Sequence, residues 1–286
     1  MNQHSVPGSV LIGLVTHPTS RYNQHGEALR NLEVTADMVR AAGWQVVTYV
    51  SDKNQFAPEE LRLTRTEIAK SAWAQAHLER RWNSYVRQGS HSRKFTSMVS
   101  MMVMAAKRSV GALSPRPAVS RDAKSLMRLK NIDAAHESIL SAAVKKDVDL
   151  VLVLEDDAHP RTESALEDLP GILSLAKARS VALFQISESI SGEVLGVEQD
   201  LLNPVSVTSV GKTKCMELSR PITNTVCANI YSAEFAARFA SRIRESVTAP
   251  IVPIDWRLNE VLLDQPSVSC WWAVPGVFQQ GSMVSE

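Results

Sequence analysis

The stretch DLVLVLEDDAHP, residues 149–160, decides the fold that we expect from this sequence. Its apolar run, 150–154, alternates leucine with valine and leads directly into the acids Glu155, Asp156 and Asp157. A short continuous apolar run of this kind is typical of a strand that is buried on both faces of a parallel sheet. Ligands of open α/β sheets bind just beyond the carboxyl ends of such strands, so we expect the chemistry at these three carboxylates.

The three acids favour a site for a hard metal ion. Adjacent carboxylates repel one another, and their burial costs free energy unless a cation or hydrogen bonds compensate. Oxygen ligands at a strand end suit Mg²⁺ or Mn²⁺, which one or two carboxylates share with substrate phosphates. The alternative is a solvated loop in which Asp157 caps a helix that follows Pro160. The buried strand in front of the acids favours the metal–phosphate site.

The composition excludes several classes of protein. The chain has 286 residues, 44% of them hydrophobic and 21% charged, with a formal net charge of +1. This length suits one large α/β domain or two small ones. The balance argues against disorder and against a general attraction to nucleic acid. No stretch approaches the roughly 20 apolar residues of a membrane span. The N-terminus lacks a basic leader, and three widely spaced cysteines fit reduced thiols in a cytoplasmic protein.

A basic segment interrupts this balance. Between Leu61 and Lys130 there are 15 Lys or Arg residues and three acids, a local net charge of +12, so the rest carries −11. Within it, the methionine-rich stretch 95–106 lies between basic pairs. This stretch is too short to span a bilayer, but 88–110 would suit a helix at a membrane surface. The alternative is a buried helix whose charged ends are solvated. We interpret 54–118 as a helical insertion in the main domain.

Periodicity and turn residues predict the other elements. Strands are expected at 9–16, 44–50, 150–154, 180–187 and 221–231, followed by an aromatic strand near the C-terminus. Helices are expected at 27–42, 58–88, 121–146 and 162–178, and directly after Ser232 and Asp255. Ser120 should cap the third of these helices, and the fourth should be broken or bent around Pro170-Gly171. The polar residues after 188 are expected to form a long loop near the site.

Three residues of the first strand–helix–strand unit are candidates for nucleotide binding. The two strand ends deliver Thr16 and Asp52 to one edge of the sheet. An acid after the second strand commonly meets a ribose or base, although a turn aspartate has the same appearance. Arg21 in the first loop could pair with a phosphate, or could be solvated.

Five segments together resemble the family 25 glycosyltransferases, which include lipooligosaccharide galactosyltransferases. They are a helix from Asn131 that carries His136, LVLEDDA from Leu152, ANIYSAEFAARF from Ala228, PIDW from Pro253 and PGVFQQ from Pro275. The resemblance covers roughly 131–282, with a generic match over 9–52. It fails across 54–118, and no histidine follows His159, where many such enzymes have a metal-binding one.

The resemblance implies a single domain, 1–286, with a GT-A-like Rossmann-type mixed sheet flanked by helices. It implies sugar transfer from a nucleotide-sugar donor, a UDP-sugar first, to a glycan or lipid-linked acceptor. Asp157 would bind Mn²⁺ or Mg²⁺, while Asp156 or Glu155 would meet the ribose or a metal-bound water. We expect a cytoplasmic protein with peripheral contact at the inner membrane face.

An acceptor hydroxyl must lose its proton, which requires a carboxylate within hydrogen-bond reach. Asp255 and Glu188 stand at element ends and are the two candidates. Asp255 is preferred because Trp256 beside it could stack on a sugar, although Asp255 could equally cap the following helix. Two other functions remain open. One is a metal-dependent nucleotidyltransferase or phosphotransferase that uses the same acids, and the other is a non-catalytic, membrane-associated assembly protein with a GT-A-like domain.

Overall fold

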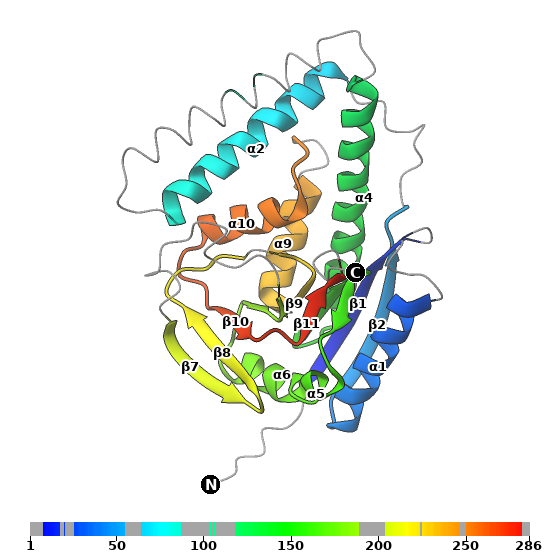
Figure 1. Ribbon diagram of the computed structural model, residues 1–286, viewed down its shortest axis with the longest axis vertical. Helices are drawn as coiled ribbons and strands as arrows, with labels where there is room; N and C mark the ends of the chain where they lie inside the picture. The colour runs from blue at the N-terminus through cyan, green and yellow to red at the C-terminus, as the bar shows by residue number, and fades with distance from the viewer. Residues whose placement is uncertain are drawn as a thin grey trace.

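The computed structural model describes residues 8–17, 20, 26–54, 64–86, 103, 106, 118–188, 204–223, 225–245 and 250–281. Within these residues the chain forms a mixed α/β fold (Figure 1). Its strands are β1 Ser9–Thr16, β2 Gln45–Asp52, β3 Leu150–Glu155, β4 Ala158–Pro160, β5 Leu183–Gln185, β6 Ser187–Glu188, β7 Pro204–Val210, β8 Thr213–Leu218, β9 Ala228–Ser232, β10 Cys270–Val274 and β11 Phe278–Gln280. Its helices are α1 Glu27–Ala41, α2 Arg65–Val86, α4 Ala118–Lys145, α5 Glu163–Leu166, α6 Leu169–Ala178, α9 Ala233–Glu245 and α10 Ile254–Asp264.

The main sheet has the strand order β2-β1-β3-β9-β5-β10-β8-β7. β1 pairs in parallel with both β2 and β3, whereas β9 runs antiparallel between β3 and β5. This confirms the predicted α/β class and the mixed, Rossmann-type sheet. β3 lies inside the sheet, and each residue from Leu150 to Leu154 is buried, as the continuous apolar run predicted.

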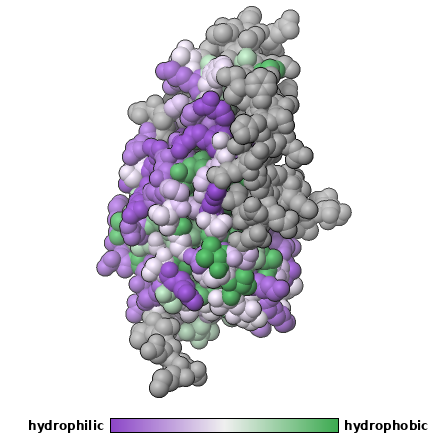
Figure 2. All heavy atoms as spheres, turned by 90° about the vertical axis from the view of Figure 1, so that its left-hand side faces the viewer, coloured by the Kyte–Doolittle hydropathy of each residue, from purple (hydrophilic) through white to green (hydrophobic). Residues whose placement is uncertain are grey.

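Helices cover both faces of the sheet. α1 and α6 pack on one face, and α4, α9 and α10 pack on the other, with α2 outside α10 and α4 (Figure 1). Successive side chains of β1 point to opposite faces, so Leu11 and Val15 join the α4 side while Ile12 and Leu14 join the α1 side. The surface that Figure 2 presents is largely hydrophilic in its upper part, with hydrophobic residues gathered lower down.

One glycine sets the distance between α4 and the sheet. A Cβ atom added to Gly13, in the middle of β1, would lie 2.2 Å from Cγ2 of Ile139 on α4. A real side chain there would clash, because carbon atoms in contact stay about 3.5–4.0 Å apart. The missing side chain therefore allows α4 to rest directly on β1.

A second, three-stranded sheet lies next to the end of β3. β11 forms its centre, antiparallel to β4 and parallel to β6. β4 follows β3 after only the two residues Asp156 and Asp157, so these acids occupy the turn between the two sheets. A backbone hydrogen bond of 2.7 Å from Gly281 N–H to the Asp157 carbonyl ties this turn to the residue after β11.

The structure corrects two helix-cap predictions. α4 begins at Ala118, so Ser120 lies inside the helix and is not its cap. Asp157 does not cap the helix after Pro160, because β4 intervenes and Thr162 Oγ1 accepts the Ala165 N–H at 3.1 Å. The expected helix over 162–178 is broken into α5 and α6 at 167–168, close to Pro170-Gly171, where a break or bend was expected.

The structure also corrects two strand predictions and one loop prediction. The expected strand over 180–187 is reduced to β5 and β6, and the strand over 221–231 begins only at Ala228. Part of the expected polar loop is the β7–β8 hairpin. Buried Asp168 holds the turn of this hairpin by accepting hydrogen bonds from the backbone N–H groups of Lys212 and Thr213.

The predicted insertion is partly visible. α2 occupies 65–86 of the helix expected over 58–88. Arg21, and 88–110 apart from Val103 and Ala106, lie outside the described residues, so the membrane-contact prediction for that segment is untested. No helix among the described residues is long and apolar enough to cross a membrane.

Candidate functional site

The carboxyl ends of β1, β2 and β3 meet at one edge of the sheet, as predicted. The register pairs Thr16 with Asp52 across β1 and β2, and Val15 with Glu155 across β1 and β3. Thr16 is buried, whereas Asp52 is exposed and accepts the Asn54 N–H at 2.7 Å. That bond is the turn role considered for Asp52.

Two of the three acids after the apolar run have a basic side chain as partner. Oε1 of Glu155 accepts a hydrogen bond from Nε2 of His136, a fully buried residue of α4, at 3.1 Å. Burial alone would raise the pKa of Glu155, but the His136 hydrogen bond and the Lys53 charge outweigh it and lower that pKa. Glu155 is therefore held as a carboxylate.

Asp156 forms a nearly buried ion pair. Nζ of Lys53 lies 3.1 Å from Oδ1 of Asp156, and the two side chains are 11% and 7% exposed. Lys53 directly follows β2, so the pair joins the ends of β2 and β3. At this depth a lone charge would be costly, and each partner therefore depends on the other.

Asp157 differs from its neighbours because one of its oxygens is unpaired. Its side chain is 7% exposed, and Oδ1 has no hydrogen-bond partner among the described residues. Burial, reinforced by the charge of Glu155, raises the pKa of Asp157 to about 6. An orphan buried oxygen is uncommon in native proteins and calls for a cation or other ligand as an explanation.

A second orphan carboxylate lies on α4. Asp133 is 6% exposed, and its Oδ1 has no partner among the described residues. Burial raises the pKa of Asp133 to about 7, and the charge of Asp255 contributes while that of Arg257 opposes. Asp133 precedes His136 by three residues, so both lie on the helix face that meets the sheet.

Asp255 lies in the first turn of α10 and is partly buried. Burial raises its pKa, hydrogen bonds from the backbone N–H groups of Trp256 and Asp255 itself oppose, and the charge of Glu155 raises it further. α10 begins at Ile254 with Pro253 as its N-cap, so Asp255 lies inside the first turn and is not the helix cap considered from the sequence, while its role as a base stays a prediction. The Trp256 ring meets Trp82 of α2 edge to face at 5.8 Å.

Glu188, the other candidate base, is in a different environment. It ends β6 in the small sheet, is exposed, and has Oε1 3.9 Å from Nη1 of Arg161. None of the pKa shifts in the acid cluster involves its charge.

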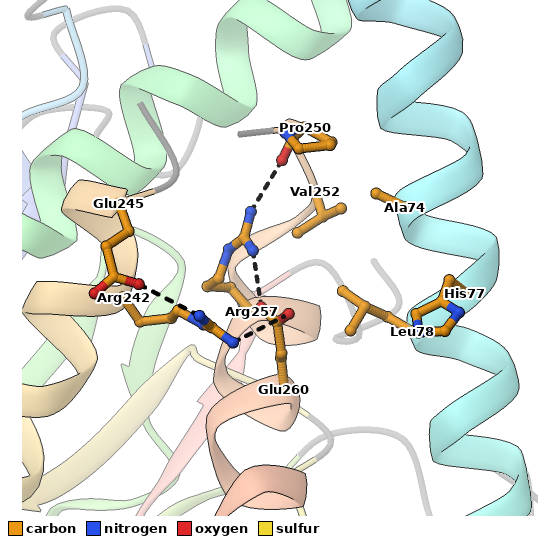
Figure 3. Close-up of a pocket in the computed structure, with 9 residues that line it drawn as sticks. All are labelled: Ala74, His77, Leu78, Arg242, Glu245, Pro250, Val252, Arg257 and Glu260. Atoms are coloured by element: carbon orange, nitrogen blue, oxygen red, sulfur yellow. Dashed lines mark hydrogen bonds and ion pairs between the residues drawn. The ribbon is translucent and has the colours of Figure 1, made fainter. Parts of the chain in front are cut away.

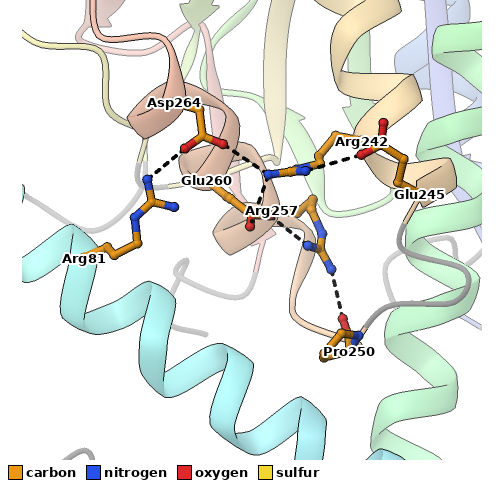
Figure 4. Close-up of polar contacts among 7 residues, drawn as sticks. All are labelled: Arg81, Arg242, Glu245, Pro250, Arg257, Glu260 and Asp264. Atoms are coloured by element: carbon orange, nitrogen blue, oxygen red, sulfur yellow. Dashed lines mark hydrogen bonds and ion pairs between the residues drawn. The ribbon is translucent and has the colours of Figure 1, made fainter.

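A cavity of about 210 Å³ lies between α2, α9 and α10 (Figure 3). Arg257 enters it from α10 and donates to the Pro250 carbonyl at 3.0 Å and to Glu260 at 2.8 Å. Glu260 and Asp264 also bind Arg242, so the cationic groups of this cavity are matched by acids (Figure 4). This network fixes Arg257, whose charge acts on Asp133.

The free oxygen of Asp157 could serve as one ligand of a metal ion. No group of three or more His, Cys, Asp or Glu side chains in the described parts of the chain is placed to bind a metal by itself. Glu155 and Asp156 are engaged, and Asp157 supplies the free oxygen. Mg²⁺ and similar ions are commonly bound by one or two carboxylates together with phosphates and water, which fits this arrangement.

Sequence reasoning missed Asp133 and Lys53. The Asp133–His136 spacing, with acid and imidazole one helical turn apart, was a usable signal for Asp133. Lys53 carried no such signal, because its partner lies 103 residues away. In comparisons with known proteins, no protein-family model and no curated protein matches the chain.

Proposed function

We propose that this protein is a glycosyltransferase that moves a sugar from a nucleotide-sugar donor, a UDP-sugar first, to a hydroxyl of a glycan or lipid-linked acceptor. The observation that carries the proposal is the free, buried Oδ1 of Asp157 at the end of β3. A buried carboxylate without a partner is costly, and a divalent cation that bridges it to a diphosphate removes that cost. The resemblance to family 25 supplies the sugar-transfer chemistry.

Each residue of the edge has a task in this proposal. A bound Mg²⁺ or Mn²⁺ would neutralise the charge that builds on the departing diphosphate. Asp157 would hold the ion, while His136 and Lys53 keep Glu155 and Asp156 in place as carboxylates facing the ribose or ion-bound water. Thr16 and Asp52 line the same edge, where the nucleoside would lie.

Asp255 is the proposed general base. Removing the acceptor proton is easiest for a group whose pKa lies near the working pH, and burial moves the pKa of Asp255 upward from its usual acidic value. Glu188 is exposed, and its charge contributes to none of the pKa shifts of Asp133, Glu155, Asp157 and Asp255, which favours Asp255 over it.

The first experiment measures nucleotide binding by thermal unfolding. UDP and Mn²⁺ together should raise Tm more than the sum of the separate effects, because a ligand that binds only the native state stabilises it. Asp157→Asn should abolish this joint stabilisation, weakening nucleotide binding roughly a hundredfold or more. Equal stabilisation of parent and variant would remove Asp157 from the metal site.

A screen of donor hydrolysis then identifies the reaction. UDP-, GDP- and CMP-sugars are incubated with and without Mn²⁺, and release of free sugar is measured. Cleavage of the sugar–phosphate bond supports sugar transfer. Cleavage within the diphosphate would indicate a nucleotidyltransferase or phosphotransferase, and no turnover or nucleotide binding would indicate an assembly protein without catalysis.

A further inference from the structure

The outward face of α2 carries a basic and aromatic stripe. Lys70, Trp73 and Arg80 lie three and seven residues apart, so they share one side of the helix. All three are exposed, and Trp73 is 47% exposed. We call these three residues the α2 outer face.

The opposite side of α2 is committed to the fold. Ile68, Leu78, Trp82 and Val86 are each at most 5% exposed, and α2 packs on α10 and α4. The two acids of the helix lie off the outer face and have local partners: Glu67 accepts from Thr64, and Glu79 from Gln75. The outer face is therefore cationic, with no acid among the residues that form it.

An exposed tryptophan between cations suits a lipid headgroup layer. Indole rings gather at membrane–water interfaces because they are largely apolar with one polar N–H. Lysine and arginine in the same plane attract anionic lipids, and their long stems lie along apolar surface. A helix with an apolar inner face and a basic outer face can lie flat on such a surface while its inner face stays packed on the protein.

The sequence that continues from α2 has the same character. Residues 87–117 contain six Lys or Arg residues and no acid, together with four methionines. A free phosphate or a soluble polyanion would need only the charges, whereas the combination with Trp73 and apolar methionines matches a surface that is both anionic and oily.

We propose that the α2 outer face binds the anionic headgroup surface of a lipid bilayer, with Lys70 and Arg80 at phosphates and Trp73 at the interface. This inference does not depend on sugar transfer. It would place the carboxylates at the end of β3 near lipid-linked acceptors if the proposed function holds.

The experiment is co-sedimentation of the full chain with vesicles. Phosphatidylcholine vesicles that contain phosphatidylglycerol are compared with phosphatidylcholine alone, at low and high salt. The parent should bind only the anionic vesicles, and less at high salt. Lys70→Glu/Arg80→Glu should weaken this binding at least about tenfold, since each basic residue near the surface contributes on the order of 1 kcal/mol. Trp73→Ala should weaken it severalfold.

The matched control reverses the same number of charges elsewhere. Arg30→Glu/Lys146→Glu alters two exposed cations on α1 and just after α4, and should keep at least half of the parent's binding. Far-UV circular dichroism and Tm confirm that each variant is folded. Equal loss in both double variants would show a general charge effect and overturn the proposal. So would unchanged binding of the α2 variant, absence of binding to anionic vesicles, or stronger binding to single-stranded RNA than to vesicles.

Discussion

Like charges gather in two regions of the molecule. The acids at and near the end of β3, which we call the acid edge, are largely buried, whereas the cations of the α2 outer face are exposed. The carboxylates of Asp133 and Asp157 are buried, each has an oxygen without a partner among the described residues, and burial raises both pKa values. Lys70 and Arg80 are exposed to water, which screens them. Without a ligand the buried charges cost folding free energy, whereas the exposed ones cost almost nothing. Substitutions at the two regions should therefore differ in which property they change.

The largest effect is expected on turnover at the acid edge. Asp255→Asn keeps the shape of the side chain but cannot accept the acceptor proton, so the rate should fall by about 10² to 10⁴ with donor affinity near the parent's. Glu188→Gln is the comparison and should retain most activity. A large loss in Glu188→Gln, with Asp255→Asn still active, would transfer the role to the small sheet.

Asp133 should reveal the folding cost of the buried edge. Its pKa rises from 3.8 to about 7 in the native state, so the native protein binds the proton more tightly than the unfolded chain. The contribution of Asp133 to the free energy of unfolding should therefore be greatest below pH 4 and decline as the pH rises towards 7, by up to about 4 kcal/mol. Asp133→Asn should remove this decline, making the variant the more stable protein at pH 8. Urea unfolding of both proteins at pH 5 and pH 8 measures it, and a difference that does not grow with pH contradicts the assignment.

Lys53 tests the paired part of the same edge. Lys53→Met leaves Asp156 nearly buried without its cation, which should lower the free energy of unfolding by about 3 kcal/mol at pH 7. Adding Asp156→Asn should restore most of the loss, because the uncompensated charge is then gone. If the double variant is as unstable as the single one, packing of the lysine stem is the cause.

The smallest effect belongs to the exposed region. Lys70→Glu/Arg80→Glu should change the free energy of unfolding by no more than about 0.5 kcal/mol, since exposed substitutions seldom do more. Urea unfolding without vesicles is the measurement. A large destabilisation would mean that the α2 outer face contributes to the fold, and would erase the contrast between the two regions.

Sequence patterns predicted those helix and strand ends that depend on residues close to one another in the chain. The bounds of β1 coincide with the predicted strand 9–16, and α1 ends one residue before the predicted position. Ser232 caps α9 as expected, accepting the Phe235 N–H at 3.2 Å. Each of these depends on residues within a few positions of one another, so periodicity and cap chemistry suffice.

Pairing between distant segments was not predictable in this way. β4, β6 and β11 have two or three residues each and exist because β11 pairs with both β4 and β6 across roughly ninety residues or more. The β7–β8 hairpin was hidden because a polar edge strand with glycines resembles a loop. For the site, the apolar run located the three acids, but only the fold shows that Oδ1 of Asp157 has no hydrogen-bond partner among the described residues and that the charge of Asp255 acts on Asp133. The roles of these residues in sugar transfer stay predictions.

The close contact at Gly13 sets how far α4 lies from the sheet, and therefore how far His136 lies from the acids at the end of β3. Ile139, which rests on this glycine, follows His136 by one helical turn on the same face of α4, so the depth of one fixes the depth of the other. A single methyl group at position 13 would push the helix away from the sheet and draw His136 back from Glu155. The length of the 3.1 Å hydrogen bond between His136 and Glu155 therefore depends on Gly13, which contributes no side chain to the site.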